Sequence, residues 1–258
     1  WFRPLILKLF ISLISYLLAN NVFAEELVAQ LSKDEVAITA NFDGSEIFIY
    51  GAVKRDGPTK SNSPLEVLIT VAGPEKPINV RRKSKRALIW VNTESIEIDS
   101  APSFYAIAST GNLEEVINNT EDLRHKVSIN RTIRSVGNYE KIKDAEDFTE
   151  ALIRIRQKNN LYQELDNSIS LIDNTLFATN IALPANLIEG DYKIRFFLIR
   201  DGKILDHLST NIPVNKVGLE RWIFDLSRKS PFIYALLSLF IAISSGWIAS
   251  TIFRYIRV

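Results

Sequence analysis

The sequence predicts a mainly β protein with a helical insertion and one C-terminal transmembrane helix. Three observations support this fold class. Between residues 25 and 107, short segments of alternating polar and apolar residues recur about every ten residues, with turn residues between them. Residues 144–158 instead carry apolar residues at helical spacing, and residues 231–253 form a run of 23 residues without a charge.

The first 24 residues have the pattern of a secretory signal peptide. Two basic residues, Arg3 and Lys8, precede an apolar run of 11 residues at 9–19. This run is too short to span a bilayer. Val22 and Ala24 are small residues that a signal peptidase accepts, so cleavage is expected after Ala24. The alternative is an uncleaved anchor over residues 4–24.

The segment from residue 25 to residue 107 is expected to contain roughly eight short strands. Their number and spacing predict an immunoglobulin-like β-sandwich, although the cysteine pair and tryptophan spacing of true immunoglobulin domains are missing. Residues 79–83 and 87–91 are expected to pair as a hairpin. The predicted strands are 36–40, 46–50, a segment that ends at 56–58, 65–71, 79–83, 87–91, 94–99 and 104–107.

A helical insertion is predicted at about 111–163. Asn112 is a candidate N-cap with Glu115 three residues later, which is the pattern of a capping box. A second helix is expected over 144–158, with acidic residues early and basic residues late, as the helix dipole favours. Its apolar face is expected to pack on the sandwich; that face consists of Ala145, Phe148, Leu152 and Ile155.

Strand patterns return after the insertion, at 175–182, 192–199 and 203–213. Asp201-Gly202 lies between the last two and is typical of a tight hairpin turn. We expect these strands to complete the first sheet around the insertion. The alternative is a small second sandwich that they form with the middle region.

The charge-free run at 231–253 is long enough to cross a bilayer, because about 1.5 Å of rise per residue covers the roughly 30 Å hydrocarbon layer. Tyr234, Trp247 and Tyr255 lie near its ends, where interfacial aromatic residues are common. A helix buried in a domain of this size would seldom be apolar on every side. The sequence therefore predicts a transmembrane helix.

Export followed by this stop-transfer helix predicts a single-pass type I membrane protein. The β-sandwich domain at 25–217 would then lie on the exported side of the membrane, and residues 254–258 would form a cytoplasmic tail. The segments on either side of the domain hold the excess of basic residues, so the domain itself is net acidic. The basic residues of the stalk suit contact with anionic lipid. Residues 218–230 are interpreted as an interfacial stalk or, alternatively, a plain linker. One side of the stalk helix would carry Leu219, Trp222, Ile223 and Leu226.

The composition argues against nucleic-acid binding and against most kinds of catalytic and metal site. The net charge is only +1, so the chain is not a dedicated nucleic-acid binder. It has no cysteine, and its two histidines, His125 and His207, have no motif partners. No phosphate-binding loop, nucleophile elbow or two-histidine metal motif is present in the sequence. We expect no catalytic residues, no cofactor and no metal.

One basic run is a candidate interaction patch: Arg81, Arg82, Lys83, Lys85 and Arg86. It is suited to anionic lipid, lipopolysaccharide or an acidic partner. The alternative is a solvated hairpin loop whose charges protect a strand edge.

A second candidate lies in the terminal helix, where Ser244, Ser245 and Gly246 are small enough for close helix packing. The same three residues are equally compatible with contact to lipid alone.

Several segments together resemble the alphaproteobacterial putative transmembrane protein family, whose members are exported and singly anchored. The resemblance covers most of the chain after residue 24, includes no catalytic motif, and implies a bacterial periplasm as the exported side. Members of that family tend to be encoded near sulfite-exporter-like permeases, which implies a transport accessory role with such a permease as partner. The segments are the leader, 36–44, 49–52, Gly73-Pro74, 80–83, 89–92, 101–105, Leu183-Pro184, 190–192 and the terminal helix.

The function expected from these observations is that of a membrane-anchored periplasmic interaction or accessory protein of an inner-membrane transporter or complex. The alternative is a tethered periplasmic ligand-binding module, for which Tyr50, Trp90 and Tyr105 are the candidate lining aromatics. An enzyme is the least favoured class, because it would have to depend on carboxylates alone.

Overall fold

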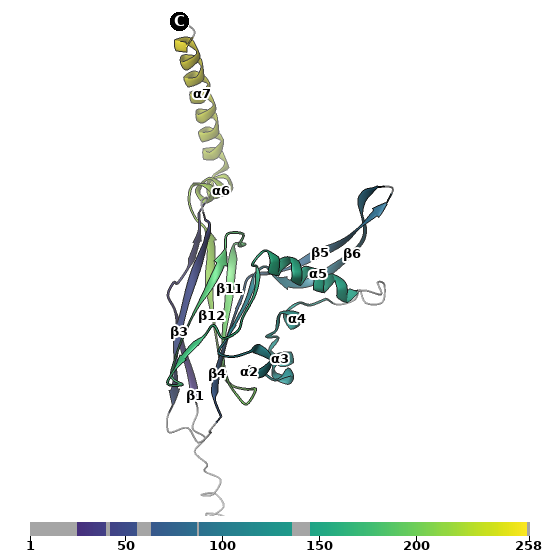
Figure 1. Cartoon of the computed structure of the whole chain (residues 1–258). Helices are drawn as coiled ribbons and strands as arrows, with labels where there is room; N and C mark the ends of the chain where they lie inside the picture. Colours follow the sequence, from purple (N-terminus) through teal and green to yellow (C-terminus); the bar gives the residue numbers. More distant parts are fainter. Residues whose placement is uncertain (1–24, 40–41, 56–62, 87, 136–144, 257–258) are drawn as a thin grey trace, which may run out of the picture.

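The computed structural model describes residues 25–39, 42–55, 63–86, 88–135 and 145–256 (Figure 1). Within them lie a β-rich body, a long hairpin that projects from it, and a long C-terminal helix. The mainly β prediction, with its helical insertion and C-terminal apolar helix, is confirmed at this level. The predicted signal peptide and the predicted turn at 56–58 lie outside the described residues.

Among the described residues, every helix follows β7 in the chain. The strands are β1 (Glu25–Leu31), β2 (Val36–Ile38), β3 (Gly44–Arg55), β4 (Leu65–Ala72), β5 (Glu75–Arg86), β6 (Ile89–Pro102), β7 (Tyr105–Ser109), β8 (Tyr162–Leu165), β9 (Ser170–Ile172), β10 (Leu176–Pro184), β11 (Gly190–Arg200) and β12 (Lys203–Lys216). The helices are α2 (Leu113–Val116), α3 (Asn119–His125), α4 (Ile129–Thr132), α5 (Ala145–Lys158), α6 (Leu219–Lys229) and α7 (Pro231–Ile256).

Two sheets form the body. The four-stranded sheet has the order β1-β3-β10-β9 and is antiparallel throughout. The six-stranded sheet has the order β2-β12-β11-β4-β7-β8, in which β2 with β12 and β7 with β8 are parallel pairs. Because β10 pairs with β3 and β11 pairs with β4, the late strands complete sheets begun before the insertion, as we expected.

The two sheets enclose one apolar core. Strand β3 alternates as its sequence predicts, with Ile47 and Ile49 fully buried and their neighbours exposed. Strands β4 and β7 are buried almost continuously, because the short helices cover their second face with Val116, Val127 and other apolar side chains. Figure 1 shows α2, α3 and α4 beside β4.

The predicted turn at Asp201-Gly202 is confirmed. Arg200 pairs with Lys203, and both intervening residues have positive φ, 52° and 72°, as a two-residue type I′ turn requires. Asn112 is also confirmed as an N-cap, since its side-chain oxygen accepts from the N–H of Glu114 at 3.2 Å.

The segment from residue 75 to residue 102 differs from the prediction. The strands expected at 87–91 and 94–99 are parts of one 14-residue strand, β6. It pairs with β5 in a separate two-stranded sheet instead of joining the body. Strand β5 alternates only Ile78 and Val80 with a long series of polar residues, so it has too little apolar surface for a central strand.

The packing of α5 also differs from the prediction. Phe148 and Ala145 pack against Ile96, and Leu152 packs against Ile98, so this face of the helix lies on the hairpin (Figure 1). On another side of α5, Ile153 packs against the core of the body. The helix therefore does contact the body, but three residues of the predicted face, Ala145, Phe148 and Leu152, cover the hairpin instead. Ile155, the fourth predicted member of that face, is 52% exposed.

Helices α6 and α7 follow β12. The segment Pro231–Arg254 is long and apolar enough to cross a membrane, the one such helix among the described residues, and its most apolar stretch is not buried by the described chain. Figure 1 shows α7 extending away from the body, with α6 at its base. The predicted C-terminal apolar helix is confirmed as a candidate span, and the stalk is a helix, not a plain linker.

Candidate interaction surfaces

The predicted basic run lies on strand β5, not in a loop. Alternation along the strand leaves Arg81, Lys83 and Lys85 exposed on one face. Arg82 points to the other face and is engaged there. Its guanidinium donates to Glu94 Oε2 at 3.0 Å and to Asp147 Oδ2 at 3.4 Å.

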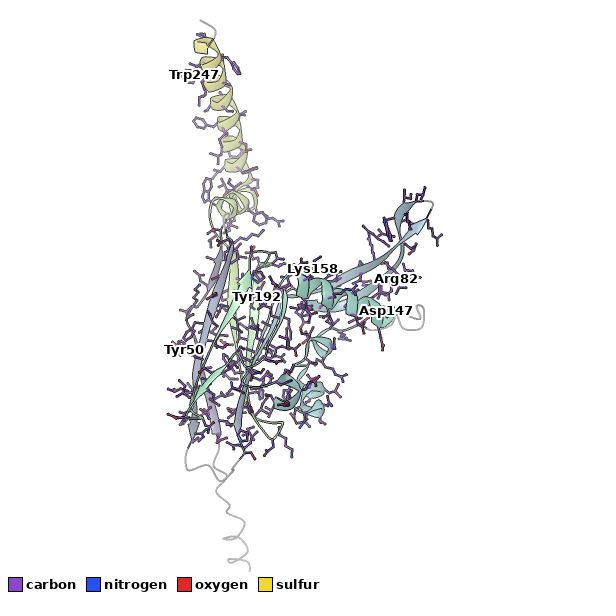
Figure 2. The ribbon with its side chains drawn as sticks, viewed as in Figure 1. Tyr50, Arg82, Asp147, Lys158, Tyr192 and Trp247 are labelled. Atoms are coloured by element: carbon purple, nitrogen blue, oxygen red, sulfur yellow. The ribbon has the colours of Figure 1, made fainter. Side chains whose placement is uncertain are left out.

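Arg82 also lies over the ring of Phe148, with its guanidinium carbon 4.6 Å from the ring centroid. Figure 2 shows Arg82 on the hairpin close to Asp147 on α5. Arg82 therefore fastens α5 to the hairpin, and the remaining cations of the run are the ones available to a partner.

The end of the hairpin exposes three consecutive apolar side chains, which the sequence prediction assigned to an ordinary strand. Leu88 is 85% exposed, Ile89 64% and Trp90 68%. Lys85 lies opposite Trp90 in the strand register, and Arg86 lies opposite Ile89. The signal that could have identified this surface is the direct succession of cations and large apolar residues between 81 and 90.

A second exposed apolar surface covers the outer face of the four-stranded sheet. We call it the outer patch; its members, all more than 40% exposed, are Val28, Phe48, Tyr50, Ile172 and Leu176. Register places Val28, Leu176 and Ile172 in one row across the sheet, through Ala52 of β3. The rings of Phe48 and Tyr50 stack with centroids 5.8 Å apart.

Charged side chains of both signs, together with polar side chains, border the outer patch. Lys54 pairs with Glu26 at 3.3 Å, and Asn180 donates to the carboxylate of Glu46. Alternation along β3 puts Phe48 and Tyr50 on one face and Ile47 and Ile49 on the other, but the patch itself depends on the pairing of β1 and β3 with the much later β9 and β10.

The three aromatics considered for a ligand pocket are not brought together. Tyr50 belongs to the outer patch, and Trp90 to the hairpin end. Tyr105 is fully buried, and its hydroxyl donates to the carbonyl oxygen of Val127 at 2.7 Å. Burial raises the pKa of Tyr105, and the nearby Arg195 partly opposes that change.

The two histidines, which show no relation in the sequence, are neighbours in the structure. The ring centroids of His125 and His207 are 5.8 Å apart, and His125 meets the edge of Phe197 at 5.7 Å. Loss of solvation lowers the pKa of His125, although Glu121 at 3.5 Å opposes this. No group of three metal-ligating side chains occurs in the part of the chain that the structure describes. The pair therefore joins α3 to the six-stranded sheet.

The predicted helix-packing residues lie on an unpartnered stretch of α7. Ser244 is half-buried and Ser245 is exposed, and a Cβ added to Gly246 would meet no atom of the described chain within 4 Å. In α6, Trp222, Ile223 and Phe224 are exposed, and Leu226 is half-buried.

Comparison with known families identifies one match. The family model described as Putative transmembrane protein (Alph_Pro_TM) matches residues 26–255. The comparison with curated proteins finds no match. The matched range includes both sheets, the hairpin and almost the whole of α7.

Proposed function

Because the chain belongs to the family Putative transmembrane protein (Alph_Pro_TM), we propose that it is a membrane-anchored accessory protein that binds another inner-membrane protein and performs no catalysis itself. The observation that carries this proposal is the outer patch on the four-stranded sheet. One face of an antiparallel sheet in contact with water normally bears polar side chains, and here its centre bears large apolar ones.

The chemistry of the outer patch favours a protein as the occupant. Exposed aromatic side chains at the centre and charged residues of both signs at the rim are the usual arrangement of a protein interface. Lys54 and Glu26 already form an ion pair at that rim, so the surface has no excess of positive charge for lipid head groups.

The proposal includes a type I topology. The signal peptide at 1–24 would direct export, the domain at 25–217 would lie in the periplasm, and residues 254–258 would remain in the cytoplasm. Only α6 and two short connections separate β12 from α7, so the body would lie close to the membrane. Arg228 and Lys229 end α6 just before the span, where they suit anionic head groups.

We also propose that the body is an immunoglobulin-like sandwich. In support, its four-stranded and six-stranded sheets share one apolar core, and their strands are largely antiparallel. Such a scaffold would hold the outer patch flat and rigid toward a partner.

Helix α7 would contribute to the same complex through Ser244, Ser245 and Gly246. Small residues let two helices approach closely, and nothing in the described chain occupies this position. By the resemblance noted for the sequence, a sulfite-exporter-like permease is the first partner to test.

The test is photo-crosslinking in the native host. A photo-reactive phenylalanine analogue replaces Phe48 or Tyr50 in the full-length protein, and Lys193, which is exposed on the other sheet, provides the control position. We expect one discrete adduct with an integral membrane protein from the two patch positions and none from position 193. Adducts absent from all three positions, or equal at all three, would contradict the proposal.

A second arm examines the helix. Replacing Ser244, Ser245 and Gly246 by leucine should weaken the adduct, because leucine side chains hold a neighbouring helix away. A protein that is recovered alone with a bound small molecule would instead support the ligand-binding alternative.

A further inference from the structure

The end of the hairpin has features that the proposed function does not use. Leu88, Ile89 and Trp90 are exposed in succession, and no other part of the described chain covers them. Leu88 also has φ of 72°, a left-handed conformation that costs a leucine energy and that glycine or asparagine would adopt readily. A large apolar side chain that is exposed and stands on a strained backbone does not stabilise the fold.

Charge is separated along the hairpin. Residues 83–93 include Lys83, Lys85 and Arg86 and no aspartate or glutamate. The carboxylates of the two strands, such as Glu94, all lie nearer the body. The outer part of the hairpin is therefore an apolar tip bordered by cations only, unlike the outer patch with its mixed rim.

The hairpin is held as an extended arm. Phe148 and Leu152 of α5 pack on its inner face, and Arg82 pairs with both Glu94 and Asp147. Beyond Arg82, Ser84 donates to Thr93 across the two strands at 3.0 Å. These contacts keep the strands together up to the tip.

The arm points toward the membrane end of the molecule. In Figure 1, β5 and β6 rise from the body and end at the level of α6, where α7 begins. Because α7 is the candidate span, the surface of a bilayer crossed by α7 lies near that level.

We propose that the hairpin tip is a second membrane contact of this protein. Leu88, Ile89 and Trp90 enter the interface of the bilayer that α7 crosses, and Lys83, Lys85 and Arg86 bind anionic lipid head groups. Tryptophan prefers the boundary between head groups and acyl chains, and the long stems of lysine and arginine reach from that depth to phosphate. The absence of carboxylates in the tip matches an anionic surface.

This inference goes beyond the proposed function and depends only on the anchoring by α7. It therefore separates from the partner proposal in a system that contains no other protein. Purified full-length chain is reconstituted into vesicles of phosphatidylcholine with phosphatidylglycerol, and resistance to alkaline extraction verifies the anchor.

The chain has no cysteine, so one introduced cysteine carries a nitroxide label at a single place. Ile89→Cys reports on the tip, and Asn79→Cys, exposed near the base of the hairpin, is the matched control. Collisions of the label with a water-soluble nickel complex are expected to be roughly fivefold fewer at position 89 than at position 79, because the tip leaves water.

Charge neutralisation tests the lipid chemistry. Lys83→Gln, Lys85→Gln and Arg86→Gln together should lower the ratio of inserted to free tips by roughly a hundredfold in anionic vesicles. Neutralising Lys126, Lys193 and Lys203, which are exposed away from the hairpin, removes the same charge and should leave the ratio unchanged.

Two results would overturn the inference. One is equal exposure of positions 79 and 89 to the nickel complex in anionic vesicles that hold the anchored protein. The other is protection of position 89 in native membranes but not in lipid vesicles, which would assign the tip to a protein partner.

Discussion

Arg195 fixes the helical insertion to the six-stranded sheet with all three of its nitrogens. Nη1 donates to the carbonyl oxygen of His125 at 2.6 Å, and Nη2 donates to the hydroxyl of Tyr105 at 3.1 Å. Nε donates to Thr70 Oγ1 at 3.0 Å. The hydroxyl of Tyr105 continues the network to Val127. One arginine thus satisfies groups on β4, β7 and the end of α3, which lysine cannot do with a single ammonium.

The first prediction concerns this network. Tyr105→Phe should lower the free energy of unfolding by about 1–2 kcal/mol, because the buried carbonyl of Val127 loses its donor. Tyr50→Phe is the control, since that hydroxyl lies on the exposed outer patch. Chemical unfolding of both variants in detergent provides the measurement. Equal stability of the two variants would show that the network contributes nothing.

The second prediction concerns pH. The pKa of His125 is below its ordinary value of about 6.5, chiefly because the ring loses solvation, and His207, Arg124 and Arg195 add to this while Glu121 opposes it. As the pH falls through that ordinary value, the unfolded chain binds the proton before the folded chain does. Stability is therefore complete above it and is lost as the pH falls further.

The comparison of wild-type protein with His125→Gln isolates this effect from the carboxylates. The wild-type protein should lose more stability than the variant between about pH 8 and pH 5.5. Parallel stability curves for the two proteins over this range would refute the assignment.

The third prediction concerns the strained residue at the hairpin tip. Leu88→Asn should raise the free energy of unfolding by about 0.5–1 kcal/mol, because asparagine accepts a positive φ more readily. The same change should weaken tip insertion in the labelled-vesicle experiment. A variant that is less stable than the wild-type protein would indicate that Leu88 packs within the chain.

At the scale of elements, the hairpin and the face of α5 that covers it stabilise each other. Phe148→Ala should cost about 3–4 kcal/mol, because its ring is buried against Ile96 and under Arg82. Ile155→Ala should change the stability by less than about 0.5 kcal/mol, because that side chain is half in water. Thermal unfolding of the two variants distinguishes the packing seen here from the predicted packing. In the predicted packing, both substitutions would lower the free energy of unfolding by similar amounts.

Element types were largely predictable from the sequence, and element partners were not. Strand β11 and helix α5 follow from local periodicity, because alternation or helical spacing fixes which side chains share a face. What that face meets depends on distant residues. Val80, Ile96 and Ile98 on the hairpin bury the predicted face of α5, and nothing near α5 in the sequence indicates this.

The candidate surfaces show the same limit. The basic run was visible as a run, but only the pairing of Arg82 with Glu94 and Asp147 shows which of its cations is already used. The sequence shows that Phe48 and Tyr50 share a face of β3 but not that this face is outward, and the outer patch requires the register of β1, β9 and β10. His125 in α3 contacts His207 in β12, and nothing in the sequence of either segment indicates this contact.

At the scale of the whole molecule, topology is the main prediction. In spheroplasts, a membrane-impermeant maleimide should label Lys193→Cys on the body and should label Val258→Cys only after permeabilisation. The native chain supplies the background control, because it has no cysteine. The opposite labelling pattern would place the body in the cytoplasm.

The position of β12 between the body and the anchor has a mechanical consequence. This 14-residue strand leads to α6 and α7, and it is paired on one side with β11 and, at its C-terminal end, on the other side with β2. If a bound partner pulls on the body, the tension enters through Val214–Lys216 along the strand axis. Hydrogen bonds perpendicular to this axis are loaded at the same time and resist the tension together. A strand pulled sideways loses its hydrogen bonds one at a time. Strand β2, which pairs with Val214–Lys216, would therefore share the load at the point where it enters the sheet.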